Sequence, residues 1–270
     1  MRLPLRSTLP GISAGISALA VACSSGGENA GTGPAATKGV MAVDSGSLAA
    51  TNPYGVPYPT ANLGTQARSG TTPGNVIQNF TFLGYANPTP GTLTDDKGSP
   101  TQISLADFYD PANKKYKVLH INASAMWCGP CNQETDAITK LGVVAGLAKD
   151  GAAILSALTE GNVRGTGSTL ADLKTWIGIN RTSIQGGPGI DYDMVLDPEA
   201  FNLSVFFNAD AVPFNLDIDV RTMEILDKGV GYDGMTPTDI ENEITWVENN
   251  PPSYGCPIGY KLTKLRCVAD

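Results

Sequence analysis

Two cysteines separated by two residues, Cys128 and Cys131, come directly after a run of β-forming residues at positions 118–123. Gly129 and Pro130 stand between the cysteines. Proline has no amide hydrogen and therefore suits the first turn of a helix. Unpaired amide donors and the helix dipole at that point stabilise an anion. The pattern therefore predicts a buried strand that leads into a helix whose first turn carries both sulfurs.

This position determines the chemistry expected of the dithiol. A free thiol has a pKa of about 8.5, and the surroundings of a helix start lower it to roughly 3.5–7.5. Cys128 is therefore predicted to be the attacking nucleophile. Cys131, one turn inside the helix and more covered, is predicted to resolve the mixed disulfide.

Two alternatives to redox chemistry are weaker. Zinc would need two further ligands, and the only histidine, His120, has no partner pair in this region. We therefore expect no metal or other cofactor, and we expect His120 to be a core or edge residue. A structural disulfide between Cys128 and Cys131 would close too small a loop to restrict the unfolded chain much.

The remaining periodicities predict an α/β domain with a short β extension on its amino-terminal side. The predicted order from the first central strand is β-α-β-α-β-β-β-α. A single helix following the dithiol is expected to end at Gly151, and Thr236 is expected to cap the last helix with Pro237 at its first position. The predicted strands lie near residues 80–82, 118–123, 153–158, 194–196, 214–219 and 223–226.

The strand, the Trp127–Cys131 motif and the following helix resemble thioredoxin. Asn122, six residues before Cys128, makes the chain most similar to the extracytoplasmic TlpA/ResA-like thiol-disulfide oxidoreductases. This resemblance implies a thioredoxin-like fold with a central mixed sheet flanked by helices, over about residues 76–250. It also implies that the dithiol exchanges disulfides with client proteins, with Trp127 as part of the site.

The same resemblance assigns roles to three further residues. Glu134, three residues after Cys131, matches an acid that ResA-like proteins carry beside their thiols, and Glu160 matches another acid more loosely. These carboxylates could tune thiol pKa values and move protons, or they could be solvated surface acids. Pro213, which follows Val212, matches the cis-proline that faces the dithiol, and the alternative is a trans-proline at a strand start.

The amino terminus predicts export. Residues 1–22 contain two arginines before a short apolar stretch and read as a signal peptide. The junction Ala20–Cys23 resembles a bacterial lipobox, which implies acylation of Cys23; an ordinary secretory signal is the alternative. Residues 23–75 are rich in Gly, Ala, Thr, Ser and Pro, which predicts a flexible tether. The expected location is the bacterial cell envelope, facing the periplasm, or the secreted fraction.

The carboxy terminus predicts a small appended module. Residues 251–270 follow a proline breaker and contain Cys256 and Cys267 in a pattern that resembles small disulfide-rich extracellular modules. A Cys256–Cys267 bridge would staple a tail that has no core of its own.

The net charge and the cysteine motif together limit the kinds of binding partner that we expect. The net charge of −8 argues against nucleic acid and against anionic lipid as an electrostatic partner, so membrane attachment is expected through the lipid anchor only. A reductase outside the cytoplasm needs electrons from a membrane donor of the DsbD/CcdA type. The two alternative functions are a peroxiredoxin-like thiol peroxidase and a non-enzymatic surface lipoprotein that keeps the fold.

Overall fold

The computed structural model describes nine stretches of the chain: residues 51–63, 67–88, 99–140, 142–179, 190–208, 211–254, 256, 260–263 and 266–269. The predicted signal peptide and Cys23 lie outside the described residues. Among the described residues, no helix is both long enough and apolar enough to cross a membrane.

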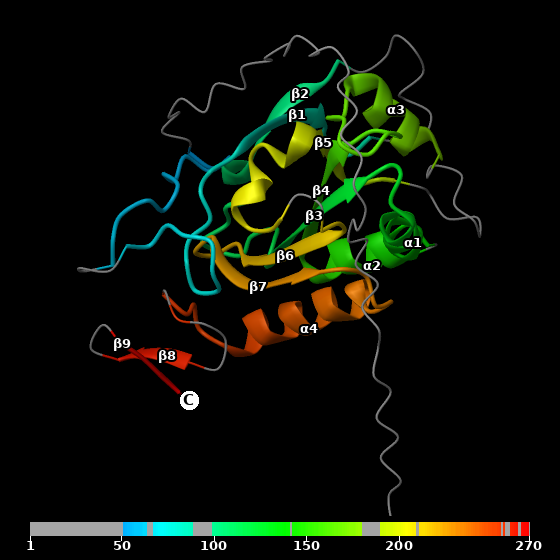
Figure 1. Ribbon diagram of the computed structural model, residues 1–270. Helices are drawn as coiled ribbons and strands as arrows, with labels where there is room; N and C mark the ends of the chain where they lie inside the picture. Colours follow the sequence, from blue (N-terminus) through cyan, green and yellow to red (C-terminus); the bar gives the residue numbers. More distant parts are fainter. Residues whose placement is uncertain are drawn as a thin grey trace, which may run out of the picture.

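Seven strands form one mixed sheet in the order β2-β1-β5-β4-β3-β6-β7 (Figure 1). Strands β3, β4 and β5 are parallel, whereas the remaining pairs are antiparallel. This arrangement confirms the predicted mixed sheet and its amino-terminal β extension. The strands are β1 (Thr81–Tyr85), β2 (Thr101–Ser104), β3 (Val118–Ala125), β4 (Ala152–Glu160), β5 (Asp193–Leu196), β6 (Phe214–Asp219) and β7 (Glu224–Val230).

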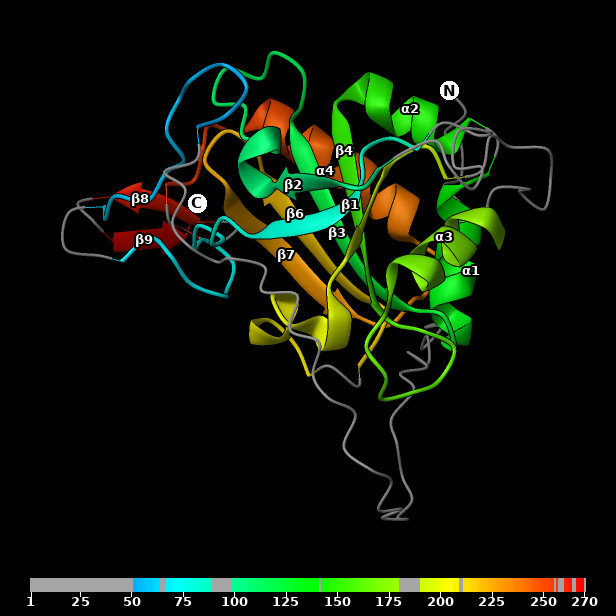
Figure 2. The ribbon, with the colours of Figure 1, turned by 90° about the horizontal axis from the view of Figure 1, so that it is seen from above.

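Four α-helices pack on one face of the sheet. They are α1 (Gly129–Ile138), α2 (Val143–Asp150), α3 (Leu170–Ile179) and α4 (Thr236–Asn249), and buried residues from all four share one apolar cluster. The opposite face is covered by the amino-terminal segment and by the 3-10 helices η1 (Leu105–Phe108) and η3 (Leu203–Val205). Figure 2 shows α1, α2 and α3 on the side of the sheet away from the blue and cyan amino-terminal segment.

Strand β3 lies inside the sheet, between β4 and β6, and is buried along its whole length. Leu119, Ile121 and Ala123 face the cluster on the side of the amino-terminal segment. Alternation then directs His120 and Asn122 to the helical side. The strand therefore places polar side chains in the interior, directly before the dithiol.

The segment after the dithiol differs from the predicted single helix. Helix α1 ends at Ile138 and α2 begins at Val143, because Gly142 adopts a left-handed conformation with φ of 82°. Glycine takes such a φ without the steric cost that other residues carry. Gly151, with φ of 109°, ends α2 as expected.

The described part of the predicted tether is packed against the domain. Asn52 donates a hydrogen bond to the carbonyl of Tyr109 (2.9 Å), and the hydroxyl of Tyr58 donates to the carbonyl of Ile77 (2.9 Å). Arg68 forms an ion pair with Glu224 at 3.1 Å. The prediction of a free tether up to residue 75 is therefore wrong for residues 51–63 and 67–75, because single buried anchors hold a segment of loop-like composition.

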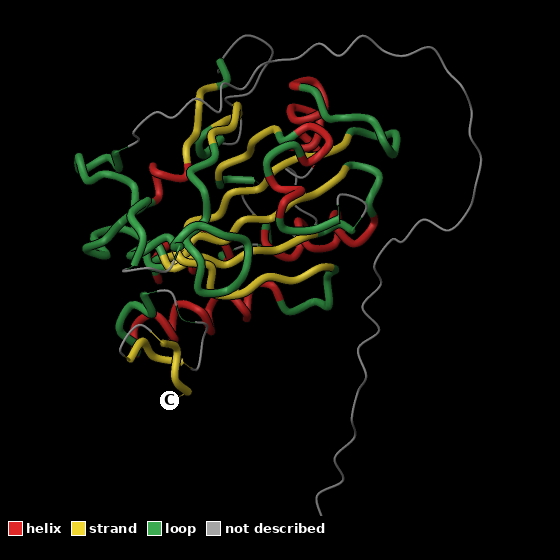
Figure 3. Tube along the Cα trace, turned by 60° about the vertical axis from the view of Figure 1, so that its left-hand side comes forward, coloured by secondary structure: helices red, strands yellow, loops and turns green. Residues whose placement is uncertain are grey.

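The last helix also begins differently from the prediction. Met235, not Thr236, is the N-cap of α4, and it makes no capping bond through its side chain. Thr236 is the first helical residue, and its buried hydroxyl points to a different partner, described below. Figures 1 and 3 show the small hairpin of β8 (Tyr260–Thr263) and β9 (Arg266–Ala269) beside the end of α4, apart from the main sheet.

Candidate active site

The dithiol sits where the sequence predicted it. Cys128 is the N-cap of α1, and Pro130 lies in the first turn. The backbone N–H of Cys131 donates to the Sγ of Cys128 at 3.3 Å. Cys128 and Cys131 form a disulfide with a Cα–Cα separation of 5.3 Å. The helix start therefore supplies an amide donor to the sulfur that is predicted to attack.

The proline loop faces this disulfide. The Val212–Pro213 peptide bond is cis, and β6 begins at the next residue. The Sγ of Cys128 lies 3.5 Å from the carbonyl oxygen of Val212. The structure therefore brings Pro213 to the dithiol, although Pro213 follows Cys131 by 82 residues in the sequence.

Both sulfurs are covered in the disulfide form. Cys128 and Cys131 are each 0% exposed and belong to the apolar cluster on the helical face, together with Met126 and Val212. Trp127 is partly exposed and packs against the same cluster. The expectation that Cys131 is more covered than Cys128 is therefore wrong for this state, because the proline loop lies directly on Cys128.

Glu134 is buried one helical turn after Cys131, in a polar network. Its side chain lies on the buried face of α1, as does that of Cys131, and Glu134 is only 1% exposed. Asn122 on β3 donates to one carboxylate oxygen at 2.8 Å, and Asn215 on β6 donates to the other at 2.7 Å. The hydroxyl of Thr236 also donates to that second oxygen. Glu134 is therefore not a solvated surface acid.

Burial determines the protonation behaviour of Glu134. Desolvation raises the pKa of its carboxyl above the usual value, although the hydrogen bond from Thr236 and the nearby His120 act in the opposite direction. A carboxyl group whose neutral form is favoured in this way can accept and release a proton closer to neutral pH. Such a group is suited to proton transfer beside a thiol.

Glu160 is also buried, at 8% exposed, and fixes the aromatic residue before the dithiol. The indole N–H of Trp127 donates to Glu160 at 2.6 Å, and the backbone N–H of Gly165 donates to the same oxygen at 2.9 Å. The guanidinium of Arg164 lies 4.7 Å from the centre of the Trp127 ring. The interpretation of Glu160 as a solvated surface acid is therefore wrong.

His120 is a core residue, which is one of the two positions that the sequence predicted for it. It is 1% exposed, and its Nδ1 lies 2.8 Å from a carboxylate oxygen of Asp217 on β6. Burial lowers the pKa of the imidazole, but the charge of Asp217 and its hydrogen bond outweigh that effect, so the pKa is raised overall. The protonated form of His120 lowers the pKa of the nearby Glu134 carboxyl.

Sequence reasoning missed Asn215 and Thr236 as parts of the site. Asn215 alternates with apolar residues on β6, a pattern that usually indicates a solvent-facing side chain. Here α4 covers that face, so the polar positions point into the interior. The only available signal was that Asn215 follows the cis-proline by two residues.

Metal binding has no visible site in the part of the chain that the structure describes. Within it, no group of three or more His, Cys, Asp or Glu side chains is placed to hold a metal ion. The expectation that the chemistry needs no cofactor stays a prediction. So does acylation of Cys23, which lies outside the described residues.

The predicted disulfide of the tail also stays a prediction. Cys256 is buried at 2% exposed, but the side chain of Cys267 lies outside the described ones.

No protein-family model and no curated protein matches this sequence. Solved structures are similar to it over about two thirds of its length. A thiol:disulfide interchange protein of the thioredoxin family from Chlorobium tepidum is 17% identical, with a TM-score of 0.41 over 65% of this chain and 99% of its own. StoA from Bacillus subtilis is 14% identical, with a TM-score of 0.40 over 64% of this chain and 98% of its own.

A further similar structure is the mitochondrial 2-cys peroxiredoxin from Plasmodium falciparum, which is 13% identical. Its TM-score is 0.47, over 66% of this chain and 97% of its own. All these TM-scores are below 0.5, so the chain's own features define the class. The strand order, the dithiol at the start of α1 and the cis-proline before β6 make this a protein of the thioredoxin-like fold. Within that fold, its motif resembles the TlpA/ResA-like group.

Proposed function

We propose that this protein is a thiol-disulfide oxidoreductase that exchanges the Cys128–Cys131 disulfide with the thiols and disulfides of client proteins. The observation that carries the proposal is the juxtaposition of the disulfide with the cis-proline loop, with Cys128 Sγ 3.5 Å from the Val212 carbonyl. A helix start that donates an N–H to this sulfur favours its anionic form once the disulfide is reduced.

The proposed reaction runs through a mixed disulfide. The Cys128 thiolate attacks one sulfur of a client disulfide, and the other client sulfur leaves as a thiolate and takes up a proton. Cys131 then loses its proton and attacks the Sγ of Cys128, which releases the second client thiolate. This second thiolate also takes up a proton from solvent. The client therefore gains two electrons from the protein and two protons from solvent, and the protein is left with its disulfide. Glu134 is the proposed acceptor for the proton of Cys131.

The direction that we propose is reduction or isomerisation of client disulfides. Gly-Pro between the cysteines resembles the reducing thioredoxins, and the buried carboxyl of Glu134 supplies a proton acceptor for the resolving step. A reductant in this position needs a supply of electrons, for which we propose a membrane dithiol donor of the DsbD/CcdA type. The proposed location is the cell envelope, on the evidence of the signal-like residues 1–22 and the lipobox-like junction at Cys23.

Trapping tests the proposed activity. In a Cys131→Ser variant the mixed disulfide at Cys128 cannot be resolved, so client proteins should accumulate in a covalent complex that reducing agent dissolves. A Cys128→Ser variant is the matched control and should trap nothing. Reduction of insulin by the wild-type protein should be lost in both variants. A Cys131→Ser variant that forms no mixed disulfide with any thiol or disulfide probe would refute the proposal.

One observation favours a second candidate, a non-enzymatic surface lipoprotein that keeps the fold. Both sulfurs are fully buried in the disulfide form, and a permanently sealed disulfide could not meet a client. The two candidates differ in the insulin assay and in the reactivity of Cys128 after reduction. An inactive protein whose reduced Cys128 stays inert would support the second candidate.

A further inference from the structure

The three groups that hold Glu134 come from three different elements. Asn122 lies on β3, Asn215 on β6 and Thr236 at the start of α4. Asn215 also accepts a hydrogen bond from Asn122 at 2.9 Å, so the two amides form a connected pair. The ionised carboxylate of Glu134 therefore has donors for both of its oxygens.

These donors differ in what they can do once Glu134 is protonated. The amide nitrogens of Asn122 and Asn215 can only donate, whereas a hydroxyl can donate or accept. The amide oxygen of Asn122 already accepts from Ser124 and Ser156, and that of Asn215 accepts from Asn122. Among these three partners, Thr236 is therefore the one that can reverse its role and accept the proton of a neutral Glu134.

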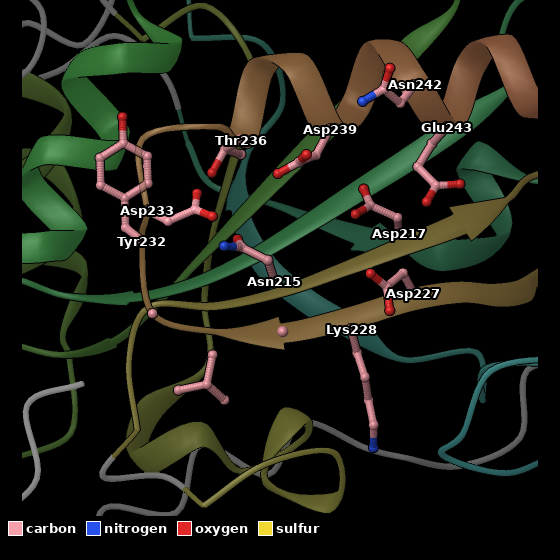
Figure 4. A pocket seen from close by; sticks show the side chains of 13 residues that line it. Asn215, Asp217, Asp227, Lys228, Tyr232, Asp233, Thr236, Asp239, Asn242 and Glu243 are labelled. Atoms are coloured by element: carbon pink, nitrogen blue, oxygen red, sulfur yellow. The ribbon is translucent and has the colours of Figure 1, made fainter. Parts of the chain in front are cut away.

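Thr236 also forms part of the wall of a cavity. The cavity has a volume of about 370 Å³ and lies between β6, β7 and the start of α4. Asn215 lines it as well, so two of the partners of Glu134 border the same space (Figure 4). A cavity of this size has room for several water molecules. Its acidic lining residues are Asp217, Asp227, Asp233, Asp239 and Glu243.

We propose that Thr236 is a positioning and proton-relay residue for Glu134, and that Glu134 exchanges protons with solvent through this acidic cavity. The inference rests on the proposed function, in which Cys131 must lose a proton to attack Cys128. It adds a route by which that proton leaves through the cavity between β6, β7 and the start of α4.

The proton balance of the route is simple. Cys131 transfers its proton to the carboxylate of Glu134, and the resulting acid O–H donates to the Oγ1 of Thr236. Thr236 passes its own hydroxyl proton to water in the cavity and takes up the proton of Glu134. One proton leaves Cys131, one enters the cavity, and Glu134 is a carboxylate again. No electrons move along this path.

The charges around Glu134 and the cavity support proton transfer from Glu134 to the cavity. Desolvation and the neighbouring carboxylates raise the pKa of Asp239, and the same causes raise the pKa of Glu243 to about 7. The cavity can therefore take up and release protons near neutral pH. The titratable groups facing Glu134 or its surroundings are His120 with Asp217, Asp239, Tyr192, Tyr232 and Asp136.

A pair of substitutions at Thr236 tests the relay in the full chain. Thr236→Val keeps the shape but removes the hydroxyl, whereas Thr236→Ser keeps the hydroxyl. Reduced protein is mixed with glutathione disulfide, quenched with acid at a series of times and analysed by mass for the mixed disulfide at Cys128. We expect the valine variant to resolve the mixed disulfide about tenfold or more slowly, because a positioned proton-transfer group contributes up to about 10²–10⁴-fold in rate. Its pH profile should also shift, and the serine variant should stay within about twofold of wild type.

Three outcomes overturn the proposal. The first is a Thr236→Val variant that resolves the mixed disulfide at the wild-type rate with the wild-type pH profile. The second is a Thr236→Ser variant that is slowed as much as the valine variant, which would indicate packing and not the hydroxyl. The third is the absence of any mixed disulfide in the wild-type protein, which would remove the proposed function itself. Formation of the mixed disulfide at a normal rate in all variants separates the first two outcomes from the third.

A second variant tests the cavity without removing any hydrogen bond to Glu134. Gly229 on β7 pairs with Asn215 and lines the cavity, and a Cβ added there meets no atom within 4 Å. Gly229→Leu should fill the space and slow resolution severalfold. Gly146→Leu on α2 is the matched control, because its Cβ position is equally open and it lies outside the cavity. Resolution at the wild-type rate in Gly229→Leu would overturn the cavity as the route.

Discussion

The indole N–H of Trp127 donates to the buried carboxylate of Glu160 across 2.6 Å, which ties the residue before the dithiol to the end of β4. The same carboxylate oxygen accepts the backbone N–H of Gly165 at 2.9 Å. One acid therefore fixes both the aromatic side chain and the loop that follows β4. Arg164 in that loop lies over the ring of Trp127. Trp127 is therefore held at its indole N–H by Glu160 and on the face of its ring by Arg164.

Removal of this acceptor should destabilise the fold. In Glu160→Leu the indole N–H of Trp127 and the N–H of Gly165 lose their partner. Both hydrogen bonds are only partly buried, so the loss should lie near the lower end of the about 1–3 kcal/mol that an unsatisfied buried donor costs. Glu160→Gln keeps an acceptor oxygen and should lose less. Urea denaturation of the oxidised protein measures the free energy of unfolding in each case. Equal loss in both variants would show that charge, and not the acceptor oxygen, matters at this position.

Reduced Cys128 should react as an activated thiol. The helix start at α1 donates an N–H to its sulfur, so the thiolate is favoured relative to that of a free thiol. After reduction, the rate of alkylation by iodoacetamide should rise with pH and reach half of its maximum below about 8.5, the value for free cysteine. Cys131→Ser allows Cys128 to be measured alone. A midpoint at or above that of free cysteine would contradict the expectation.

Stability should fall with rising pH because of Asp197. Desolvation raises the pKa of this buried carboxyl to about 6, against hydrogen bonds from the N–H groups of Asn202 and Leu203. A carboxyl whose pKa is raised in the folded state favours folding most when it is protonated, below its unfolded pKa of about 3.9. That contribution is lost as the pH rises through about 6, and it amounts to roughly 3 kcal/mol.

The Asp197→Asn variant isolates this contribution. Its side chain stays neutral, so the difference in unfolding free energy between wild type and variant should move in favour of the variant as the pH rises from about 4 to about 7. Other buried carboxyls titrate in both proteins and cancel in the difference. Urea denaturation at a series of pH values gives the curve, and a difference that does not change with pH would contradict the prediction.

Local sequence patterns were sufficient for the parts of the site that depend on neighbours in the chain. The β-forming run before Cys128 and the proline in the first turn specify a strand, a helix start and a dithiol, because each of these is a short-range property. The cis peptide bond before Pro213 could be predicted only from the family resemblance, because the presence of a proline does not by itself show whether its peptide bond is cis or trans. The sequence predicted the order of these elements along the chain, whereas their order in the sheet comes from the structure.

The rest depends on contacts between distant segments. The role of Asn215 is decided by α4, which covers a face of β6 that the alternation marks as polar. Thr236 has the side chain of a cap, but it bonds to an acid 102 residues earlier. The segment from residue 51 has the composition of a tether, yet Asn52 and Tyr58 each find one buried partner. Composition averages over residues and cannot reveal such single anchors.

The amino-terminal extension gives a last prediction, at Gly84. This residue lies on β1 opposite Val195 of β5, and a Cβ added to it would lie 2.6 Å from the Cα of Val195 and 2.8 Å from its Cγ1. Because the Cα belongs to the backbone of an internal strand, the sheet can relieve this overlap only by moving β1 away from β5. Gly84→Ala should therefore cost about 1–3 kcal/mol of unfolding free energy, as overpacking of a close-packed interior does.

A matched glycine in the same sheet separates this overlap from the general effect of the substitution. Gly229 on β7 has no atom within 4 Å of an added Cβ, so Gly229→Ala should leave the free energy of unfolding unchanged within about 0.5 kcal/mol. Urea denaturation of the two variants compares them directly, and hydrogen exchange of the β1 amides should increase only in Gly84→Ala. Equal stability of the two variants would mean that β1 does not lie against β5 as closely as the register indicates, and the extension would then contribute little to the sheet that carries the dithiol.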